Sequence, residues 1–399
     1  MSSPTVPSST EKPGSSAATH PLNTIGLYGP WAASLVPDEP AKLSFRRASF
    51  NDVDSWREQA RSRLLERLAQ PDTGGVPQVT VHRSFEYDGL HIEELSWQLP
   101  YGEPTKAYFL KPAGAVGPLP GVLGLHCHSG NKFFGAHKIV QLSDERHPAM
   151  VALQARNYSG RAWANELAKR GYAVLVPDAF AFGSRRVLVE GVIEPVRGGL
   201  NDPELDDVAG IEAYNQWAGN HEHVLAKSLF SAGTTWPGVF SAEDQRSLDV
   251  LCARPDVDAS RVGCGGLSGG GLRTVMLAGL DPRIQCAVCV GMMSTWRDYL
   301  LNKVHTHTWM CYVPLLPQEL DYPEILALRA PLPTLVLNNT EDPLFTLPEM
   351  RRADAIMGEV FAKAGAADHY ACSYYPGPHK FDTPMQAEAF DWFDRWLQP

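Results

Sequence analysis

The strongest constraint on the fold is a series of short, nearly continuous apolar runs separated by segments with helical periodicity. Strands that are apolar on both faces belong to a parallel sheet that helices cover on both sides. Residues 161–171 and 241–255 carry the helical spacing of such covering helices. The pattern predicts an α/β fold with a mostly parallel central sheet. The apolar runs are 120–128, 172–178, 261–268, 284–291, 333–339 and 370–377.

The part of the chain before these runs has a different pattern. Residues 50–68 place apolar and charged side chains at helical spacing and stop before Pro71, which predicts an amphipathic helix. Three segments with partial period-two alternation follow, at 78–87, 91–99 and 105–112. Turn residues separate them, so they are expected to pair antiparallel at one side of the sheet.

Two segments interrupt the alternation of strands and helices. The first contains a helix-like section and is too long for a loop, so it is expected to fold over the rim of the sheet. The second is dense in aromatic, His and Pro residues, and both follow strands, where α/β folds place ligand sites. After the first interruption, Ser241 and Asp244 resemble a capping box at the start of the helix pattern 241–255. The expected organisation is a disordered tail at 1–24, a helical extension at 25–75, and one catalytic domain at 76–399 with insertions near 184–240 and 296–330.

Composition excludes several classes of protein. The chain is 44% hydrophobic and 20% charged, which is typical of a soluble globular protein. A net charge of -10 without any Lys/Arg-rich run argues against nucleic-acid binding. No stretch reaches the roughly 18 apolar residues of a membrane span, and the first two dozen residues lack the apolar block of a secretory signal. We therefore expect a cytoplasmic protein whose seven cysteines are reduced and mostly buried.

One serine lies among glycines between an apolar run and a helix pattern. Residues 266–270 read Gly-Leu-Ser-Gly-Gly, a G-x-S-x-G in a strand-turn-helix context. Side chains at 266 and 270 would clash with the adjoining strand and helix, and glycine removes them. This arrangement predicts a nucleophile elbow that holds Ser268 above the sheet at a helix N-terminus. A simple glycine-rich turn is the alternative, whereas a phosphate-binding loop lacks its Lys and a dinucleotide site would follow the first strand.

A serine nucleophile needs a base, and an acid that orients the base, later in the chain in the order Ser, Asp or Glu, His. Asp342 follows the apolar run 333–339, and His379 follows the last run. Because the carboxyl ends of parallel strands meet at one edge of the sheet, both are expected near Ser268. Glu341 could take the role of Asp342, and His369 should lie at the opposite edge.

These residues resemble the α/β-hydrolase family, in particular the branch of dienelactone hydrolases and acetyl xylan esterases that is related to prolyl oligopeptidases. The resemblance covers residues 77–397 in element order and implies a sheet of about eight strands. It also implies a catalytic triad of Ser268, Asp342 and His379, without a cofactor. Its most specific motifs are GGLSGGG at 265–271, DPLF at 342–345 and GPHKF at 377–381.

The resemblance further implies an oxyanion hole. One donor is the backbone N–H after the nucleophile, here Gly269, and the other comes from the loop after the third strand of the family's sheet. Many relatives have His-Gly where this chain has His126-Cys127. This points to the N–H of His128, with Ser129 as the substitute.

The sequence gives weaker signals for the residues that line the substrate pocket. The segment 305–318 could line an acyl pocket or could be a packed rim. Asp178, Arg185 and Arg186 are expected to be architectural. The candidates for the substrate pocket are Ser129, Trp309, Met310 and Tyr312.

The sequence therefore predicts a serine hydrolase that cleaves a small-molecule carboxylic ester through an acyl-enzyme. Thioesters, lactones, peptides and carbon-carbon bonds remain alternatives on the same triad. A second class is a metal-dependent hydrolase built on His126 and His128. His305 and His307 repeat the same spacing. No further ligands follow in a recognisable pattern, so no metal is expected. A hydrolase fold used only for binding is a third. Homo-oligomers, in which the insertions cover a neighbouring pocket, are compatible with the sequence.

Overall fold

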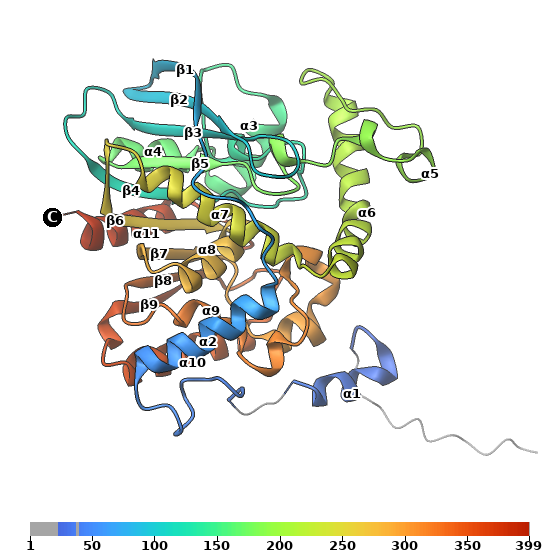
Figure 1. Cartoon of the computed structure of the whole chain (residues 1–399), viewed down its shortest axis with the longest axis vertical. Coiled ribbons are helices and arrows are strands. Elements are labelled where there is room, and N and C mark those ends of the chain that lie inside the picture. Colours follow the sequence, from blue (N-terminus) through green and yellow to red (C-terminus); the bar gives the residue numbers. More distant parts are fainter. Residues whose placement is uncertain (1–22, 37–39, 399) are drawn as a thin grey trace, which may run out of the picture.

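A central sheet of nine strands runs through the whole protein (Figure 1). The computed structural model describes residues 23–36 and 40–398, so all but the last two positions of the predicted tail lie outside the described residues. The strand order is β1-β2-β3-β5-β4-β6-β7-β8-β9. The strands are β1 (Thr80–Tyr87), β2 (Leu90–Trp97), β3 (Thr105–Pro112), β4 (Leu119–Gly124), β5 (Ala173–Pro177), β6 (Val257–Leu267), β7 (Ile284–Val290), β8 (Thr334–Asn339) and β9 (Tyr370–Tyr375).

The sheet is parallel over the six strands from β5 to β9 and antiparallel at the β1 side. The strands β1, β2 and β3 pair antiparallel with their neighbours, and β3 pairs antiparallel with β5. All pairs from β5 through β4, β6, β7 and β8 to β9 are parallel. Both predictions are confirmed: the alternating segments form the antiparallel side, and the apolar runs form the parallel core. The sheet has one strand more than the resemblance implied.

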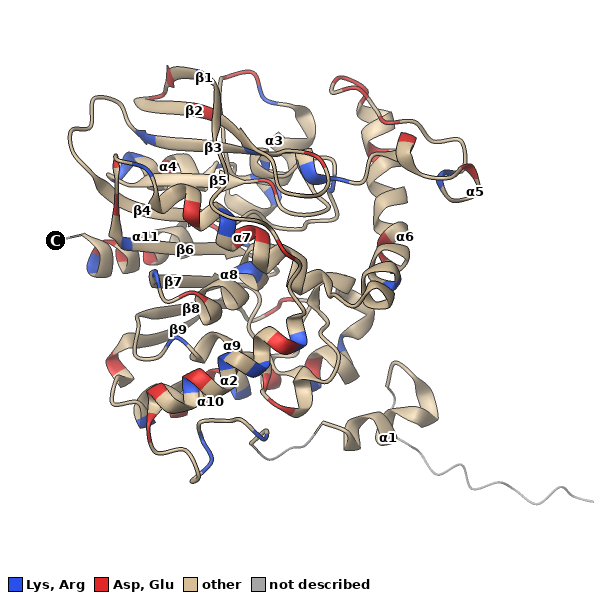
Figure 2. Cartoon of the chain, in the orientation of Figure 1, with Lys and Arg blue, Asp and Glu red and all other residues tan. Residues whose placement is uncertain are grey.

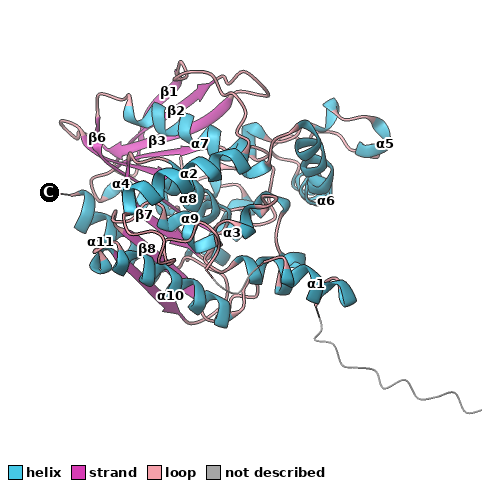
Figure 3. Ribbon diagram, turned by 60° about the horizontal axis from the view of Figure 1, so that its bottom comes forward, coloured by secondary structure: helices cyan, strands magenta, loops and turns pink. Residues whose placement is uncertain are grey.

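Helices cover both faces of the sheet (Figure 3). One apolar core joins the sheet to α7, α8, α9 and α10, with α2 packed on the outside. A second core, on the other face, joins it to α3, α4 and α11. The helices are α1 (Gly29–Ser34), α2 (Val53–Leu68), α3 (Pro148–Tyr158), α4 (Trp163–Lys169), α5 (Glu194–Arg197), α6 (Val208–Ala232), α7 (Trp236–Cys252), α8 (Gly269–Leu280), α9 (Tyr322–Ala327), α10 (Leu347–Lys363) and α11 (Thr383–Leu397).

Side-chain caps set the beginnings of the outer helices. The Asp52 carboxylate accepts a hydrogen bond from the Ser55 N–H at 2.7 Å, which begins α2 close to the predicted position. Charged side chains of both signs alternate along the outer helices α2 and α10 (Figure 2), as expected for solvated faces.

The capping box predicted for the helix at 241–255 is wrong. Helix α7 begins at Trp236, where the Thr235 hydroxyl accepts from the Gly238 N–H at 2.9 Å. Ser241 and Asp244 lie inside this helix and are buried. The stronger start signal is Thr235 followed by Pro237 in the first turn, where proline loses no hydrogen bond. Because α7 covers the sheet, the first interruption of the alternation ends about five residues earlier than predicted.

The first insertion carries α5 and the long helix α6, which stand out from the body of the protein (Figures 1 and 3). The Asp207 carboxylate caps the start of α6, and Gly233, with φ of 88°, ends it in the left-handed conformation. Glu222 on the inner side of α6 contacts His128, in the loop after β4. The helix therefore covers the carboxyl edge of the parallel strands, as the sequence predicted for this segment.

The turn between β6 and α8 has the tightest backbone packing near this edge. Ser268 has φ of 59° and ψ of -119°, a backbone conformation that residues other than glycine rarely adopt. A Cβ atom at Gly266 or Gly270 would lie 2.1 or 2.0 Å from the carbonyl oxygen of Leu125. Only glycine fits at these two positions, which confirms the predicted tight strand-turn-helix geometry.

Two predictions about the whole chain can also be compared with the structure. All seven cysteines are free, and five of them are buried, as expected. Among residues 23–36 and 40–398, the helices are too short or too polar to cross a bilayer.

The elbow predicts a large difference between two glycine substitutions. Gly270→Ala should lower the free energy of unfolding by about 2–3 kcal/mol, because the new methyl group meets backbone atoms that cannot move independently. Gly358→Ala in α10 meets no atom within 4 Å and should raise it by about 0.5–1 kcal/mol. Urea unfolding followed by circular dichroism measures both. Equal stability of the two variants would show that the Leu125 contact does not constrain the turn.

Candidate active site

The Ser268 hydroxyl emerges from the carboxyl end of β6 at the start of α8. The Ser268 N–H donates to the Val290 carbonyl at 2.9 Å, which fixes the turn to the end of β7. Gly269 is the first residue of α8, so its N–H lies in the turn where a helix leaves amide groups without internal partners. The positive end of the helix dipole is therefore next to the hydroxyl.

His379 and Asp342 form a close pair. The Nδ1 atom of His379 lies 2.6 Å from Oδ2 of Asp342, and the carboxylate is 4% exposed. Its other oxygen accepts from the Leu344 N–H at 2.9 Å. Glu341 is exposed, so of the two candidate acids Asp342 contacts the histidine. His369 precedes β9 and contacts Pro331 at the opposite end of the strand, as predicted.

The ring of His379 packs against the end of β7 next to the serine. A Cβ atom at Gly291 would lie 3.0 Å from Cε1 of His379, and Gly291 has φ of 56°. Gly291 follows Val290, which binds the Ser268 N–H. The second ring nitrogen of His379, Nε2, is buried and has no hydrogen-bond partner in the described part of the chain. Ser268 and His379 line the same cavity.

The loop after β4 approaches the serine turn from the other side. A Cβ atom at Gly269 would lie 2.9 Å from the backbone nitrogen of His128. Lys138 donates from Nζ to the carbonyl oxygens of Cys127 and His128 at 2.8 and 3.1 Å. In a planar trans peptide the N–H points opposite to the C=O. The His128 N–H is thus directed away from Lys138.

Lys138 is completely buried beneath this loop. Its Nζ lies 4.5 Å from the centre of the Phe182 ring. Burial lowers the pKa of Lys138 to about 7. A lysine in this position adds positive potential behind the loop whenever it is protonated.

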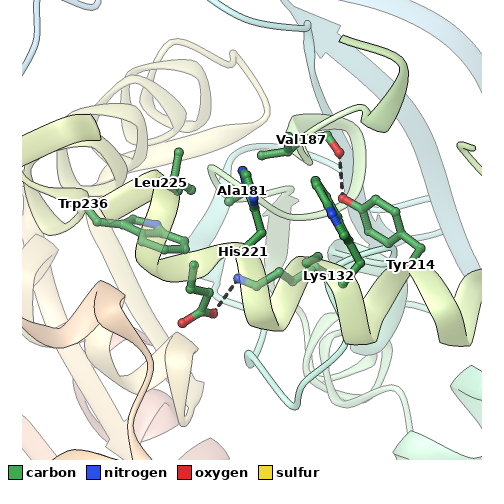
Figure 4. A pocket seen from close by; sticks show the side chains of 10 residues that line it. Lys132, Ala181, Val187, Tyr214, His221, Leu225 and Trp236 are labelled. Carbon is green, nitrogen blue, oxygen red and sulfur yellow. Dashed lines mark hydrogen bonds and ion pairs between the residues drawn. The ribbon is translucent and has the colours of Figure 1, made fainter. Parts of the chain in front are cut away.

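Glu222 on α6 joins three separate segments. Its Oε1 accepts from Nε2 of His128 at 2.7 Å and pairs with Nζ of Lys132 at 2.8 Å. Its Oε2 accepts from the Thr308 hydroxyl at 2.6 Å and from the Trp309 N–H at 3.1 Å. Figure 4 shows Lys132 next to Trp236, whose ring centre is 4.8 Å from Nζ. This network holds α6 and the second insertion against the loop after β4.

The same network sets the protonation of His128. The Nδ1 atom accepts from the Gly130 N–H at 3.0 Å, so Nε2 carries the hydrogen that Glu222 accepts. Burial lowers the pKa of His128 to about 4. Burial raises the pKa of Glu222, but the hydrogen bonds and charges of His128 and Lys132 outweigh it and hold that pKa well below its usual range.

A cavity of about 730 Å³ contains these groups. The loop after β4 contributes His128 and Ser129, and the second insertion contributes residues 305–308 and Cys311. Of the four predicted pocket residues, Ser129 lines the cavity and the other three do not. The short helix Trp309–Cys311 exposes Trp309, buries Met310 in the core and directs the Tyr312 hydroxyl to the Tyr299 and Val304 carbonyls.

Three of the four histidines considered as metal ligands, His126, His128 and His307, contact protein groups. Nε2 of His126 accepts from the Ala179 N–H at 3.1 Å, and Nδ1 lies 3.1 Å from the Cys127 carbonyl. His128 uses both ring nitrogens in the network described above, and His307 contacts the Leu344 carbonyl at 2.9 Å. Groups of three or more His, Cys, Asp or Glu side chains with metal-binding spacing do not occur among the described residues.

The residues expected to be architectural contact the backbone or buried partners. The Asp178 carboxylate accepts from the Ala136 and Ser184 N–H groups at 2.7 and 2.8 Å. Arg185 pairs with the buried Glu243 at 2.6 Å, and Arg186 lies 3.8 Å from Asp202. Asp178 thereby ties the loop after β5 to the loop after β4.

Sequence reasoning missed Glu222 and Lys138. Both lie in segments whose polarity is ordinary, and neither belongs to a motif. A buried position for Glu222 could have been suspected from the apolar spacing of Ile211, Tyr214 and Ala218 on the same helix, which continues to residue 222. For Lys138 we find no sequence signal.

Comparison with known proteins supports the fold. No family model matches the chain. The Bacillus subtilis (strain 168) protein YtaP, provisionally named a hydrolase, is 28% identical over 345 residues, which are 86% of this chain and all of YtaP. A Bacteroides fragilis NCTC 9343 structure, provisionally named an acetyl xylan esterase, superposes with a TM-score of 0.65 at 17% identity, over 88% of this chain and 83% of that one.

A glucuronoyl esterase from Solibacter usitatus superposes with a TM-score of 0.60 at 16% identity, over 90% of this chain and 98% of that one. The chain has the α/β-hydrolase fold. The resemblance stated from the sequence motifs is confirmed at the level of this fold.

The Glu222 network predicts a large loss of stability when its charge is removed. Glu222→Gln should lower the free energy of unfolding by about 3–5 kcal/mol, because Lys132 is left buried without a carboxylate. Adding Lys132→Met should recover part of this loss. Glu212→Gln, on the exposed side of α6, should change it by less than about 0.5 kcal/mol. Denaturant unfolding tests this, and equal effects of the two glutamate substitutions would contradict it.

The buried histidines predict a loss of stability in mild acid. Burial lowers the pKa of both His128 and His307 to about 4. Between pH 6.5 and 4, these two histidines bind protons in the unfolded chain but not in the folded protein. The free energy of unfolding should therefore decrease as the pH is lowered through this range, by at most about 1.4 kcal/mol per pH unit for each histidine. Denaturant unfolding at several pH values should show a shallower slope for the double variant His128→Gln, His307→Gln. His82→Gln, on the exposed β1, should keep the wild-type slope.

Proposed function

We propose that this protein is a serine hydrolase that cleaves a carboxylic ester through an acyl-enzyme. The observation that carries the proposal is the His379–Asp342 pair at 2.6 Å: His379 lines the same cavity as Ser268, and its Nε2 atom has no hydrogen-bond partner among the described residues. A base oriented by a buried carboxylate, in one cavity with a half-buried serine hydroxyl, is the arrangement that activates serine.

In the first step, His379 removes the proton of Ser268 as its oxygen attacks the ester carbonyl. Asp342 keeps the hydrogen on Nδ1, so that Nε2 is the basic atom, and stabilises the imidazolium that forms. Protonated His379 then donates to the departing alcohol. In the second step, His379 deprotonates a water molecule that attacks the acyl-enzyme, and Ser268 is released.

The negative charge on the carbonyl oxygen would be stabilised by the N–H groups of Gly269 and His128. Their mutual closeness and the orientation that Lys138 imposes on the His128 peptide support this pair of donors. Each donor of this kind contributes about 3 kcal/mol to transition-state stabilisation, and a general base contributes a factor of about 10² to 10⁴ in rate.

Small esters are the favoured substrates. Among the solved structures with the same fold, those compared above carry the names acetyl xylan esterase and glucuronoyl esterase, and the relative YtaP carries the name hydrolase. Thioesters and lactones use the same machinery and stay open as alternatives. The metal-dependent alternative is disfavoured, because the ring nitrogens of His126 and His128 already contact protein groups.

Replacing the nucleophile tests the proposal. Ser268→Ala should reduce hydrolysis of 4-nitrophenyl acetate by at least about 1,000-fold and prevent labelling by a fluorophosphonate, because no other group forms the acyl-enzyme. Ser260→Ala, at an exposed serine of β6, should keep both properties. Retained turnover in a folded Ser268→Ala protein, or activity that a chelator removes, would refute the proposal.

The acid can be tested with its neighbour as a matched control. Asp342→Asn should lower kcat by about 10³- to 10⁴-fold, because an amide stabilises the wrong histidine tautomer. Glu341→Gln should have little effect, since that side chain is exposed. The same loss in both variants would assign the effect to the turn instead of to the carboxylate.

A further inference from the structure

An arginine lines the cavity next to the proposed reacting groups. Arg156, in the last turn of α3, lines the 730 Å³ cavity together with Ser268 and His379. It also lines an adjoining cavity of about 340 Å³ that residues of α3 and α6 enclose. Arg156 is an exposed residue that borders both spaces, at a place that a substrate larger than its ester group would reach.

Asn157 holds this arginine between the two loops of the site. The Nε atom of Arg156 donates to Oδ1 of Asn157 at 3.2 Å, so the amide nitrogen of Asn157 faces Ser129 and donates to its hydroxyl at 2.8 Å. The backbone carbonyl of Asn157 accepts from the N–H of Phe381 at 2.7 Å. Phe381 lies two residues after His379. Asn157 itself is 5% exposed. The arginine is thus anchored through a buried residue to the His128 loop and to the His379 loop.

The terminal nitrogens of Arg156 are available to a ligand. Among the described residues, Asn157 is the hydrogen-bond partner of the guanidinium through Nε, and no carboxylate forms an ion pair with it. The edge that carries Nη1 and Nη2 can donate two parallel hydrogen bonds to the two oxygens of one carboxylate.

The other charges of the cavity wall are compensated. Glu222 is paired with Lys132, and Asp342 is paired with His379. Glu212, which lines the adjoining cavity, makes no ion pair with Arg156. In a chain with a net charge of -10, the described wall of this cavity carries one unpaired cation and no unpaired carboxylate. Such a cavity attracts an anion and disfavours a cationic substrate.

We propose that the substrate is an ester that also carries a carboxylate, and that Arg156 binds this carboxylate through Nη1 and Nη2. This inference rests on the proposed ester hydrolysis and specifies its substrate class. Ser129, which Asn157 holds in the same wall, lies next to the bound group and orients it through its hydroxyl. The carboxylate belongs either to the acyl part or to the alcohol part of the ester.

Matched pairs of substrates test the inference on each side of the ester. For the acyl side, methyl 4-carboxybenzoate is compared with methyl 4-carbamoylbenzoate; for the alcohol side, 4-acetoxybenzoate is compared with 4-acetoxybenzamide. Within each pair the carboxylate is replaced by an amide of similar shape. The measured quantity is the ratio of kcat/KM between the two members of a pair. In the wild type at least one ratio should favour the carboxylate, and this preference should weaken as salt is added.

Arg156→Gln should lower that ratio about 10- to 100-fold, the size expected for hydrogen bonds to a charged group, and Arg156→Lys should lower it less. The matched control is Arg161→Gln, which removes the same charge at an exposed position nearby, where Arg161 lies 3.9 Å from Glu166. It should leave the ratio unchanged. A purely structural role of Arg156 at the end of α3 would change the melting temperature but not the ratio.

The outcomes separate this inference from the proposed function. If esters are hydrolysed but both ratios stay the same in Arg156→Gln, the carboxylate site is refuted and the esterase stands. If no ester is hydrolysed, the proposed function fails, and titration calorimetry of benzoate against wild type and Arg156→Gln still decides whether Arg156 binds a carboxylate. Equal binding by the two proteins would refute it.

Discussion

The contact between the Leu125 carbonyl and the glycines at 266 and 270 is the constraint on which the rest of the site depends. Both glycines approach one carbonyl oxygen so closely that a methyl group at either position would overlap it. This contact brings the end of β4 against the turn between β6 and α8. As a result, Ser268 is held in a strained conformation, and the backbone nitrogen of His128 comes to lie beside Gly269. The strain is tolerated because the surrounding sheet and helix determine the turn completely.

Buried charges then orient the loops around this turn. Lys138 donates to two consecutive carbonyl groups of the loop after β4, and Glu222 accepts from the His128 side chain of the same loop. Burying these charges is costly, so each is compensated by hydrogen bonds or by an opposite charge. In the proposed mechanism this matters, because a loop held from both sides keeps its N–H groups in place without moving during a reaction.

The walls of the cavity come from segments that the α/β-hydrolase fold does not itself require. The elbow and the proposed acid and base lie at the ends of β6, β8 and β9, whereas Glu222, Thr308 and Arg156 come from the two insertions and from the end of α3. This division is common in enzymes of one fold with many substrates, where the strands carry the chemistry and the connecting segments choose the molecule. Among the described residues of this wall, the unpaired Arg156 guanidinium is therefore the feature from which we infer the substrate class.

The sequence by itself determined the parts that depend on local patterns. Apolar runs identified the parallel strands, glycine spacing identified the elbow, and the positions of Asp342 and His379 after two strands placed them at its edge, because parallel strands end together. It favoured Asp342 and kept Glu341 as an alternative, since the direction of a side chain in a turn depends on what packs against the turn. It also selected Trp309, Met310 and Tyr312 by their chemistry, although the short helix there turns them away from the cavity. Glu222, Lys138 and Arg156 were decided by the tertiary structure alone, because their roles arise from how separate segments pack together, and no local pattern records that packing.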